Sequence, residues 1–181
     1  MSGFRIDVDL SALGMDALSD GAEAAVRPAA QAGSQVFYDQ VKTNVRGLGR
    51  KTGNLDKSIY QVYSRDNSNQ ARAEYHISWN RKKAPHGHLV EFGHVQRYVT
   101  YIDKRGQWQT AVRPSMRGKP RPKRSASLAV KDAYYVPLNG GPRIVGAKSF
   151  VRSATTPALQ RRARNTMVDR FWFELEQRGL L

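Results

Sequence analysis

One carboxylate, Glu91, lies inside an apolar run that covers residues 87–94 and reads GHLVEFGH. Its direct neighbours in the chain, Val90 and Phe92, belong to residue types that favour the protein interior. A buried carboxylate without a partner strongly destabilises a fold. Any fold of this chain must therefore bring hydrogen-bond donors or water to Glu91, and this requirement limits the possible structures more than any other single feature.

Helical periodicity marks both ends of the chain. Near the N-terminus, apolar residues recur every three or four positions, at Leu18, Ala22, Ala25, Ala29, Ala32 and Val36. This spacing predicts an amphipathic helix over 16–48, with either a kink or the start of a second helix at Pro28.

The C-terminal helix is predicted over 153–178, with Thr156 as its N-cap before Pro157. Every fourth residue is apolar, at Leu159, Ala163, Met167, Phe171 and Leu175, and Val168 and Trp172 are expected to extend the same face.

Alternation of apolar and polar residues predicts strands between these helices. We expect a short strand or extended arm over 4–10. Strands over 58–64 and 71–79 are expected to form a hairpin, the strand pair of residues 55–80. Residues 84–94, which contain Glu91, are predicted to form a short helix or turn.

Residues 95–147 are predicted to form a basic insertion. A second hairpin is expected from 98–102 and 108–112, and another strand over 133–138. Proline, arginine, lysine and serine dominate 113–131, which predicts a mobile loop. The sequence thus predicts one α+β domain, in which an antiparallel sheet packs against a long N-terminal helix and a C-terminal helix, with a long basic loop or hairpin as an insertion.

Positive charge dominates the composition, because 30 lysines and arginines face 15 acidic residues, a net charge of +15. This imbalance predicts an acidic partner. The candidate contact residues are Lys104, Arg105, Arg113, Arg117, Lys119, Arg121, Lys123 and Arg124. A flexible basic loop binds DNA without reading its sequence, or it becomes ordered against an acidic protein, and the sequence leaves both alternatives open.

Catalytic and metal-binding patterns are absent from the sequence. The neighbouring histidines His86, His88 and His94 lack the spacing of a zinc site. The carboxylates of Asp66, Glu74 and Glu91 could converge but lack the spacing of a nuclease. There is no phosphate-binding loop and no serine-nucleophile motif. We therefore expect no catalytic, metal or cofactor residues, and no enzyme activity.

The chain has no cysteine, and no window approaches the roughly 18 apolar residues of a membrane span. The first residues also lack the apolar centre of a signal peptide. We expect a soluble protein that is made in the cytoplasm.

Three short motifs follow one another along the chain. The first, over 52–59, predicts a turn into a strand, and the third, over 149–154, predicts a first helical turn anchored by Phe150. Their key residues are Thr52, Gly53, Leu55, Ser58 and Ile59; Val90, Glu91, Phe92 and Gly93; and Phe150, Arg152 and Ala154. With the two long helices, this order resembles the HK97 gp10-like proteins of tailed bacteriophages, also called tail-completion or head–tail joining proteins, over about residues 16–178. Where that family usually has proline before the phenylalanine, this chain has Ser149.

The resemblance implies a structural protein without cofactor that acts at the neck of the virion. It implies a homo-oligomeric ring, with a hexamer as the expected form, in contact with neighbouring neck, terminator or tail-tube proteins. The expected location is the virion, with the host cytoplasm during assembly and no membrane contact. Genomic DNA is a candidate nonspecific partner, and a nonspecific nucleic-acid-binding module is the alternative function. In this setting we expect Glu91 to accept backbone N–H groups or to pair with Arg152, which would hold the 87–94 turn on the last helix.

Overall fold

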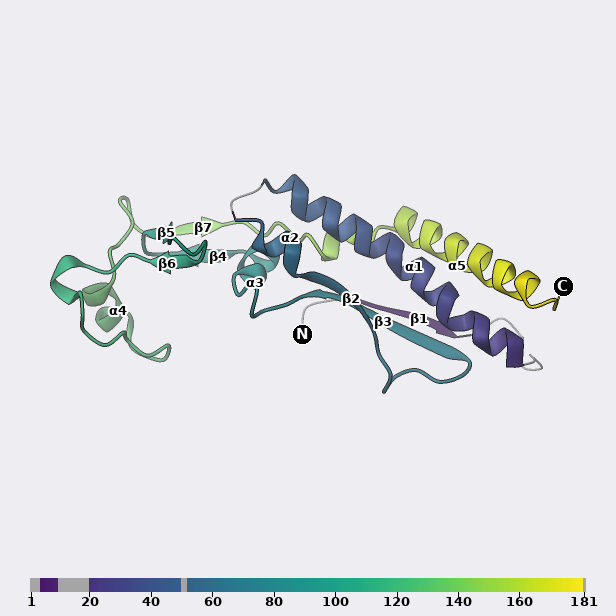
Figure 1. Ribbon diagram of the computed structural model, residues 1–181. Helices are drawn as coiled ribbons and strands as arrows, with labels where there is room; N and C mark the ends of the chain where they lie inside the picture. Colours follow the sequence, from purple (N-terminus) through teal and green to yellow (C-terminus); the bar gives the residue numbers. More distant parts are fainter. Residues whose placement is uncertain (1–3, 10–19, 50–51, 181) are drawn as a thin grey trace. The chain divides into compact units, whose positions relative to one another are not determined.

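The computed structural model describes residues 4–9, 20–49 and 52–180 (Figure 1). Its fold is α+β, as the sequence predicts. The described residues form two compact units. Unit 1 is built from Met1–Glu91 and Lys148–Leu181, and unit 2, which we call the insert, is Phe92–Ala147. The insert coincides closely with the basic insertion predicted over 95–147.

A three-stranded antiparallel sheet lies at the centre of unit 1, with the strand order β1-β3-β2. Its strands are β1 (Phe4–Asp9), β2 (Ile59–Tyr63) and β3 (Arg72–Trp79). Gln61 of β2 lies opposite Ile77 of β3. The predicted N-terminal strand and the predicted hairpin are both confirmed.

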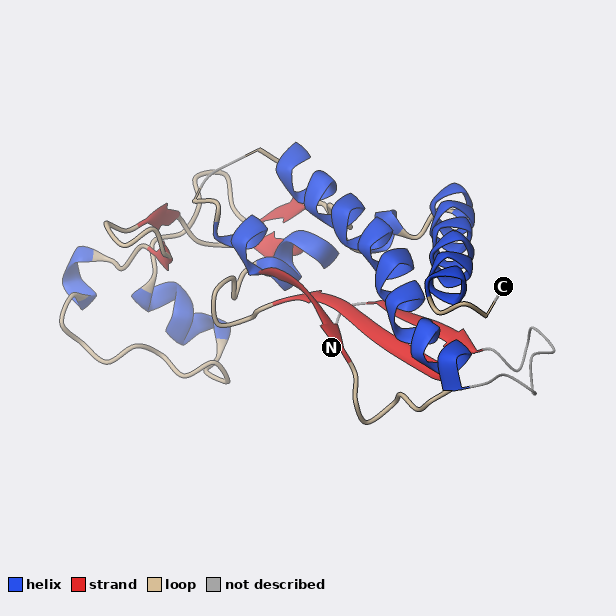
Figure 2. Cartoon of the chain, turned by 45° about the vertical axis from the view of Figure 1, so that its right-hand side comes forward, coloured by secondary structure: helices blue, strands red, loops and turns tan. Residues whose placement is uncertain are grey.

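Two long helices, α1 (Asp20–Gly47) and α5 (Pro157–Gln177), lie side by side over one face of this sheet (Figures 1 and 2). Pro28 lies within α1, so a second helix does not start there. The predicted helical residues 16–19 fall outside the described residues. Thr156 caps α5 as predicted, because its hydroxyl accepts the Leu159 N–H directly before Pro157 fixes the first turn.

Side-chain size along α1 divides the core of unit 1 into two clusters. The N-terminal half of α1 supplies small residues that pack with β3 and α5, namely Ala22, Ala25, Val26, Ala29 and Ala30 against Ala73, Tyr75, Phe171 and Leu175. The C-terminal half supplies larger residues, namely Phe37, Val41 and Val45 with Ile59, Ile77, Trp79, Ala84, Phe150, Val151, Ala154 and Ala163. Alternate residues of β3 enter these clusters because successive side chains of a strand point to opposite faces.

Three sequence predictions about unit 1 are wrong. The first motif enters a short helix, α2 (Asn54–Ser58), and not a strand, because Gly53 at φ 74° turns the chain and its carbonyl accepts the Lys57 N–H. Phe150 lies in the turn before the 3-10 helix η3 (Arg152–Ala154), and not in the last helix. Val168 and Trp172 are exposed on α5, since each follows directly after a residue of the inner side and therefore lies about 100° further around the helix.

The insert contains two antiparallel ribbons. One joins β4 (His94–Gln96) to β7 (Arg143–Val145), and the other joins β5 (Thr100–Ile102) to β6 (Trp108–Thr110). The second ribbon confirms the predicted hairpin.

Between β6 and β7 the chain forms the 3-10 turn η2 (Pro114–Met116) and the helix α4 (Leu128–Tyr134). The strand predicted over 133–138 is wrong for Ala133 and Tyr134, because Ser127 caps a helix that runs through Tyr134. Beyond this helix the chain is extended, and Tyr135 and Pro137 form isolated antiparallel bridges with Val112 and Tyr98. The loop predicted over 113–131 has defined structure. The Arg113 Nε donates to the Asp132 and Tyr135 carbonyls, at 3.1 Å in each case, and ties the two ends of this segment together.

Within the insert, all of whose residues are described, only Tyr134 is buried. Ordering a backbone costs about 1–2 kcal/mol per residue, and apolar burial normally offsets that cost. In the isolated chain we expect the amides of the insert to exchange with solvent much faster than those of β3 and α1. Hydrogen exchange read by mass spectrometry measures this, and equal protection in both units would contradict it.

The predicted single domain is tested by calorimetry of the same sample, where one unfolding transition is expected.

Candidate assembly site

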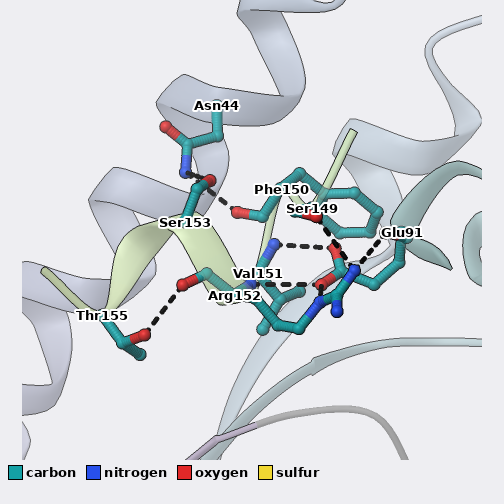
Figure 3. Close-up of polar contacts among 8 residues, drawn as sticks. All are labelled: Asn44, Glu91, Ser149, Phe150, Val151, Arg152, Ser153 and Thr155. Atoms are coloured by element: carbon teal, nitrogen blue, oxygen red, sulfur yellow. Dashed lines mark hydrogen bonds and ion pairs between the residues drawn. The ribbon is translucent and has the colours of Figure 1, made fainter. Parts of the chain in front are cut away.

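Glu91 lies in the short helix α3 (Gly87–Phe92) and has no solvent-exposed surface. One of its carboxylate oxygens, Oε2, accepts the Val151 N–H at 2.9 Å. The other, Oε1, accepts both the backbone N–H and the Nε of Arg152, at 3.1 Å each (Figure 3). Three donors from one turn of the chain therefore meet the charge that the sequence places in an apolar run.

Arg152 extends this network beyond the carboxylate. Its Nη2 donates to the Glu91 carbonyl at 3.0 Å and to the Ser149 hydroxyl at 2.9 Å. The contacts predicted for Glu91, to backbone N–H groups and to Arg152, are thus present. The partner segment is the turn before α5, whereas the sequence predicted the last helix itself. We call Glu91, Ser149, Val151 and Arg152 the Glu91 latch.

The Glu91 latch lies where the insert leaves unit 1 and where it returns, after Glu91 and before Lys148. The Lys148 N–H donates to the Val90 carbonyl at 2.8 Å, and the Ser149 N–H donates to the Glu91 carbonyl at 3.2 Å. Ser149 has φ 46°, a left-handed conformation. A proline is restricted to φ of about −65° and could not adopt it, so the departure from the family pattern at this position has a conformational reason.

Asn44 of α1 is a residue that sequence reasoning missed. Its Nδ2 donates to the Phe150 carbonyl at 2.9 Å and to the Ser153 hydroxyl at 3.0 Å (Figure 3). It thereby holds the 150–153 turn against α1. A polar residue near the end of a helix carries no signal of a contact that is 106 residues away in the chain.

The three sequence motifs converge on one core cluster. Ile59, Phe150 and Ala154 are buried in it, and Leu55 and Val90 pack against it. Other motif residues shape the local chain: the buried Ser58 hydroxyl donates to the Leu55 carbonyl, and the Thr52 hydroxyl accepts the Asn54 N–H. Phe92 and Gly93 begin the insert, and Phe92 is exposed.

The basic candidate residues all lie in the insert, and most are exposed. Arg121 donates to the Gln109 side chain, and Arg113 donates to two backbone carbonyls. Among the described residues, no lysine or arginine of the insert pairs with a carboxylate. In unit 1, by contrast, several do, including Lys42 with Asp56 and Arg170 with Glu174.

Groups of three or more histidine or acidic residues that could hold a metal do not occur in the described part of the chain. Glu74 is buried in β3, where it contacts His76 Nε2 at 2.6 Å and accepts the Asn67 amide at 3.0 Å. Burial, and to a smaller extent the neighbouring His88, lower the pKa of His86. In the part of the chain that the structure describes, no helix has the length and apolar character needed to cross a membrane.

Residues 13–93 match the model of a protein family described as "Bacteriophage HK97-gp10, putative tail-component". These residues are similar to that family, and we call them the HK97 gp10-like segment. No curated protein and no solved structure matches the chain.

The HK97 gp10-like segment contains the first two motifs, and the third lies beyond it. The sequence resemblance is thus confirmed over 13–93. The family description supports a bacteriophage tail component that belongs to the virion. Because Glu91 is in the segment and Arg152 is outside it, the Glu91 latch joins the family segment to the C-terminal part of the chain.

Proposed function

We propose that this protein is a non-enzymatic subunit of a homo-oligomeric ring, with a hexamer as the expected form, that acts in head–tail joining or tail completion at the phage neck. The HK97 gp10-like segment supports a role in the tail. The proposal depends most on one observation, the pair of exposed aromatic residues on the outer side of α5.

The inner side of α5 is buried through Ala163, Phe171 and Leu175. Its outer side carries Trp172 and Phe173, each 45% exposed. Clustered exposed aromatic residues are typical of protein contacts. A second copy of the chain would cover the outer side of α5 in a ring.

A ring contact is head-to-tail, so each subunit needs a second surface that differs from the first. Strand β2 supplies a candidate. It lies at the edge of its sheet, and Tyr60 and Val62 are exposed on it. Among the described residues β2 pairs only with β3, so its other edge is available to a neighbouring subunit.

Trp172→Gln is the test of the ring. Light scattering after size exclusion, together with negative-stain electron microscopy, should show rings for the unmodified chain and a shift toward monomers for this variant. A buried interface tryptophan contributes about 2 kcal/mol or more, so the dissociation constant should rise by roughly 30-fold. The matched control is Trp108→Gln, which removes a tryptophan of similar exposure from the insert and should leave the rings intact. A monomeric unmodified chain would refute the ring.

The place of action is tested by deleting the gene from its phage. We expect heads and tails that do not join, and added purified protein should restore joining. Normal infectious particles without the protein would exclude the proposed role.

Nonspecific DNA binding is the second candidate function, favoured by the basic side chains of the insert that have no carboxylate partner. Binding to a short duplex of arbitrary sequence should then weaken steeply with salt, since log K falls by about 0.9 per phosphate contact for each tenfold rise in salt concentration. A flat salt dependence would exclude it.

A further inference from the structure

We propose that the insert is a docking arm for an acidic protein surface that also presents an apolar groove, on a neighbouring component of the same virion. The contact is made by two apolar pairs on the ribbons of the insert together with its cations, none of which pairs with a carboxylate among the described residues. This inference rests on the proposed assembly role and names the chemistry of one partner.

Each ribbon of the insert carries an exposed apolar pair. Val95 of β4 lies directly opposite Ile144 of β7, and the two side chains are 52% and 86% exposed. Ile102 of β5 lies opposite Trp108 of β6, and both are exposed. Residues directly opposite each other in an antiparallel pair share a face of the ribbon. Each ribbon therefore presents a compact apolar patch to its surroundings.

The insert does not stabilise itself by burial, because Tyr134 is its only buried residue. Many large apolar side chains of the insert are exposed at its surface, namely Phe92, Val95, Val99, Tyr101, Ile102, Trp108, Leu128, Val130 and Ile144. Patches of this kind on a segment without a core mark a surface that a partner completes.

The charge of the insert identifies the partner as acidic. It contains two aspartates, Asp103 and Asp132, against eleven lysines and arginines: Arg97, Lys104, Arg105, Arg113, Arg117, Lys119, Arg121, Lys123, Arg124, Lys131 and Arg143.

Both aspartates are already used inside the insert. Asp103 accepts the Gln107 and Arg105 N–H groups and the Gln109 side chain, and these bonds, above all that from Gln107, lower its pKa. Asp132 accepts the Tyr98 hydroxyl at 2.7 Å. Counter-charge for the cations must therefore come from outside the insert.

The apolar pairs favour a protein over DNA and over a second copy. A duplex offers phosphates along its backbone, but it would leave Val95 and Ile144 in water. The insert of a second copy carries the same excess of cations, eleven against two aspartates, which opposes close approach of two inserts. An acidic protein with an apolar groove satisfies both the charges and the apolar side chains.

Two variants of the full chain separate these contributions. Val95→Thr with Ile144→Thr keeps β-branched residues in the ribbon and leaves the net charge unchanged, but it removes the apolar pair. Arg117→Gln, Lys119→Gln, Arg121→Gln and Lys123→Gln together remove four charges and leave the pair. The probes are heads and tails purified separately from the gene-deleted phage, and a short DNA duplex. Binding to each is measured by co-sedimentation over a range of salt.

We expect the Val95/Ile144 variant to bind the particles at least about tenfold more weakly, with unchanged DNA binding. The four-charge variant should weaken binding to the particles and flatten its salt dependence. Leu48→Thr replaces an exposed apolar residue of unit 1 that lies outside α5 and β2. It is the matched control for particle binding and should behave as the unmodified chain does.

Full particle binding by the Val95/Ile144 variant would overturn the inference. So would loss of DNA binding but not of particle binding in the four-charge variant, which would identify DNA as the ligand of the insert. Circular dichroism and ring formation are checked for each variant. If the unmodified chain forms no ring yet the Val95/Ile144 variant still loses particle binding, the ring fails and the docking arm stands.

Discussion

Replacing Glu91 by glutamine is expected to lower the free energy of unfolding by about 2–4 kcal/mol, because the substitution breaks a buried charge-assisted network without changing its shape. Glu91 is fully buried and accepts three N–H donors. An amide offers one oxygen in place of two and turns an NH₂ group toward the N–H of Val151 or Arg152. Arg152 is partly exposed, so water recovers part of its loss, which keeps the effect below that of a fully buried pair.

Thermal unfolding followed by circular dichroism measures this effect, and the melting temperature should fall by roughly 5–15 °C. The matched control is Glu174→Gln on α5, which also removes a carboxylate paired with arginines, Arg170 and Arg178. Those are pairs along a helix surface and should contribute only about 1 kcal/mol together. Equal melting temperatures for Glu91→Gln and the unmodified chain would show that the Glu91 latch does not stabilise the fold.

Gly93→Ala is expected to open the β4–β7 ribbon. Gly93 has φ 75°, where a side chain costs about 1–2 kcal/mol. A Cβ there would also lie 2.7 Å from the Val145 carbonyl oxygen and 2.8 Å from the Ala147 nitrogen. Both are backbone atoms that cannot rotate away, so overpacking adds about 1–3 kcal/mol.

Gly106→Ala is the control that isolates this collision. Gly106 has nearly the same conformation, φ 73°, but a Cβ there would meet nothing within 4 Å. Hydrogen exchange of the β4 and β7 amides and joining of heads to tails are the two measurements. We expect Gly93→Ala to lose the protection of these amides and the joining of heads to tails, and Gly106→Ala to retain both properties. The same loss for both variants would attribute the effect to backbone conformation alone.

Local patterns predicted most of unit 1. The period of α1, the capping of α5 and the alternation along β3 depend on residues close together in the chain, which is why these elements were recognised correctly. The same reasoning failed at residues 133–134, which end a helix that Ser127 begins, although Tyr135 and Pro137 directly after them do form β-bridges. It also failed at Val168 and Trp172, because the apolar pattern of one helix does not show how much of its surface a neighbouring helix covers.

By itself the sequence determined that Glu91 needs donors and that positive charge gathers between the second and third motifs. It also determined that 13–93 resembles a family of phage tail components. Only the tertiary structure decided that Val151 and Arg152 hold the Glu91 carboxylate and that Asn44 holds the same turn against α1. The same structure left the insert's apolar pairs exposed. The physical reason is that the type of a residue alone shows that it needs a hydrogen-bond partner. Which residue becomes that partner depends on the folded chain, which brings distant residues within hydrogen-bond range.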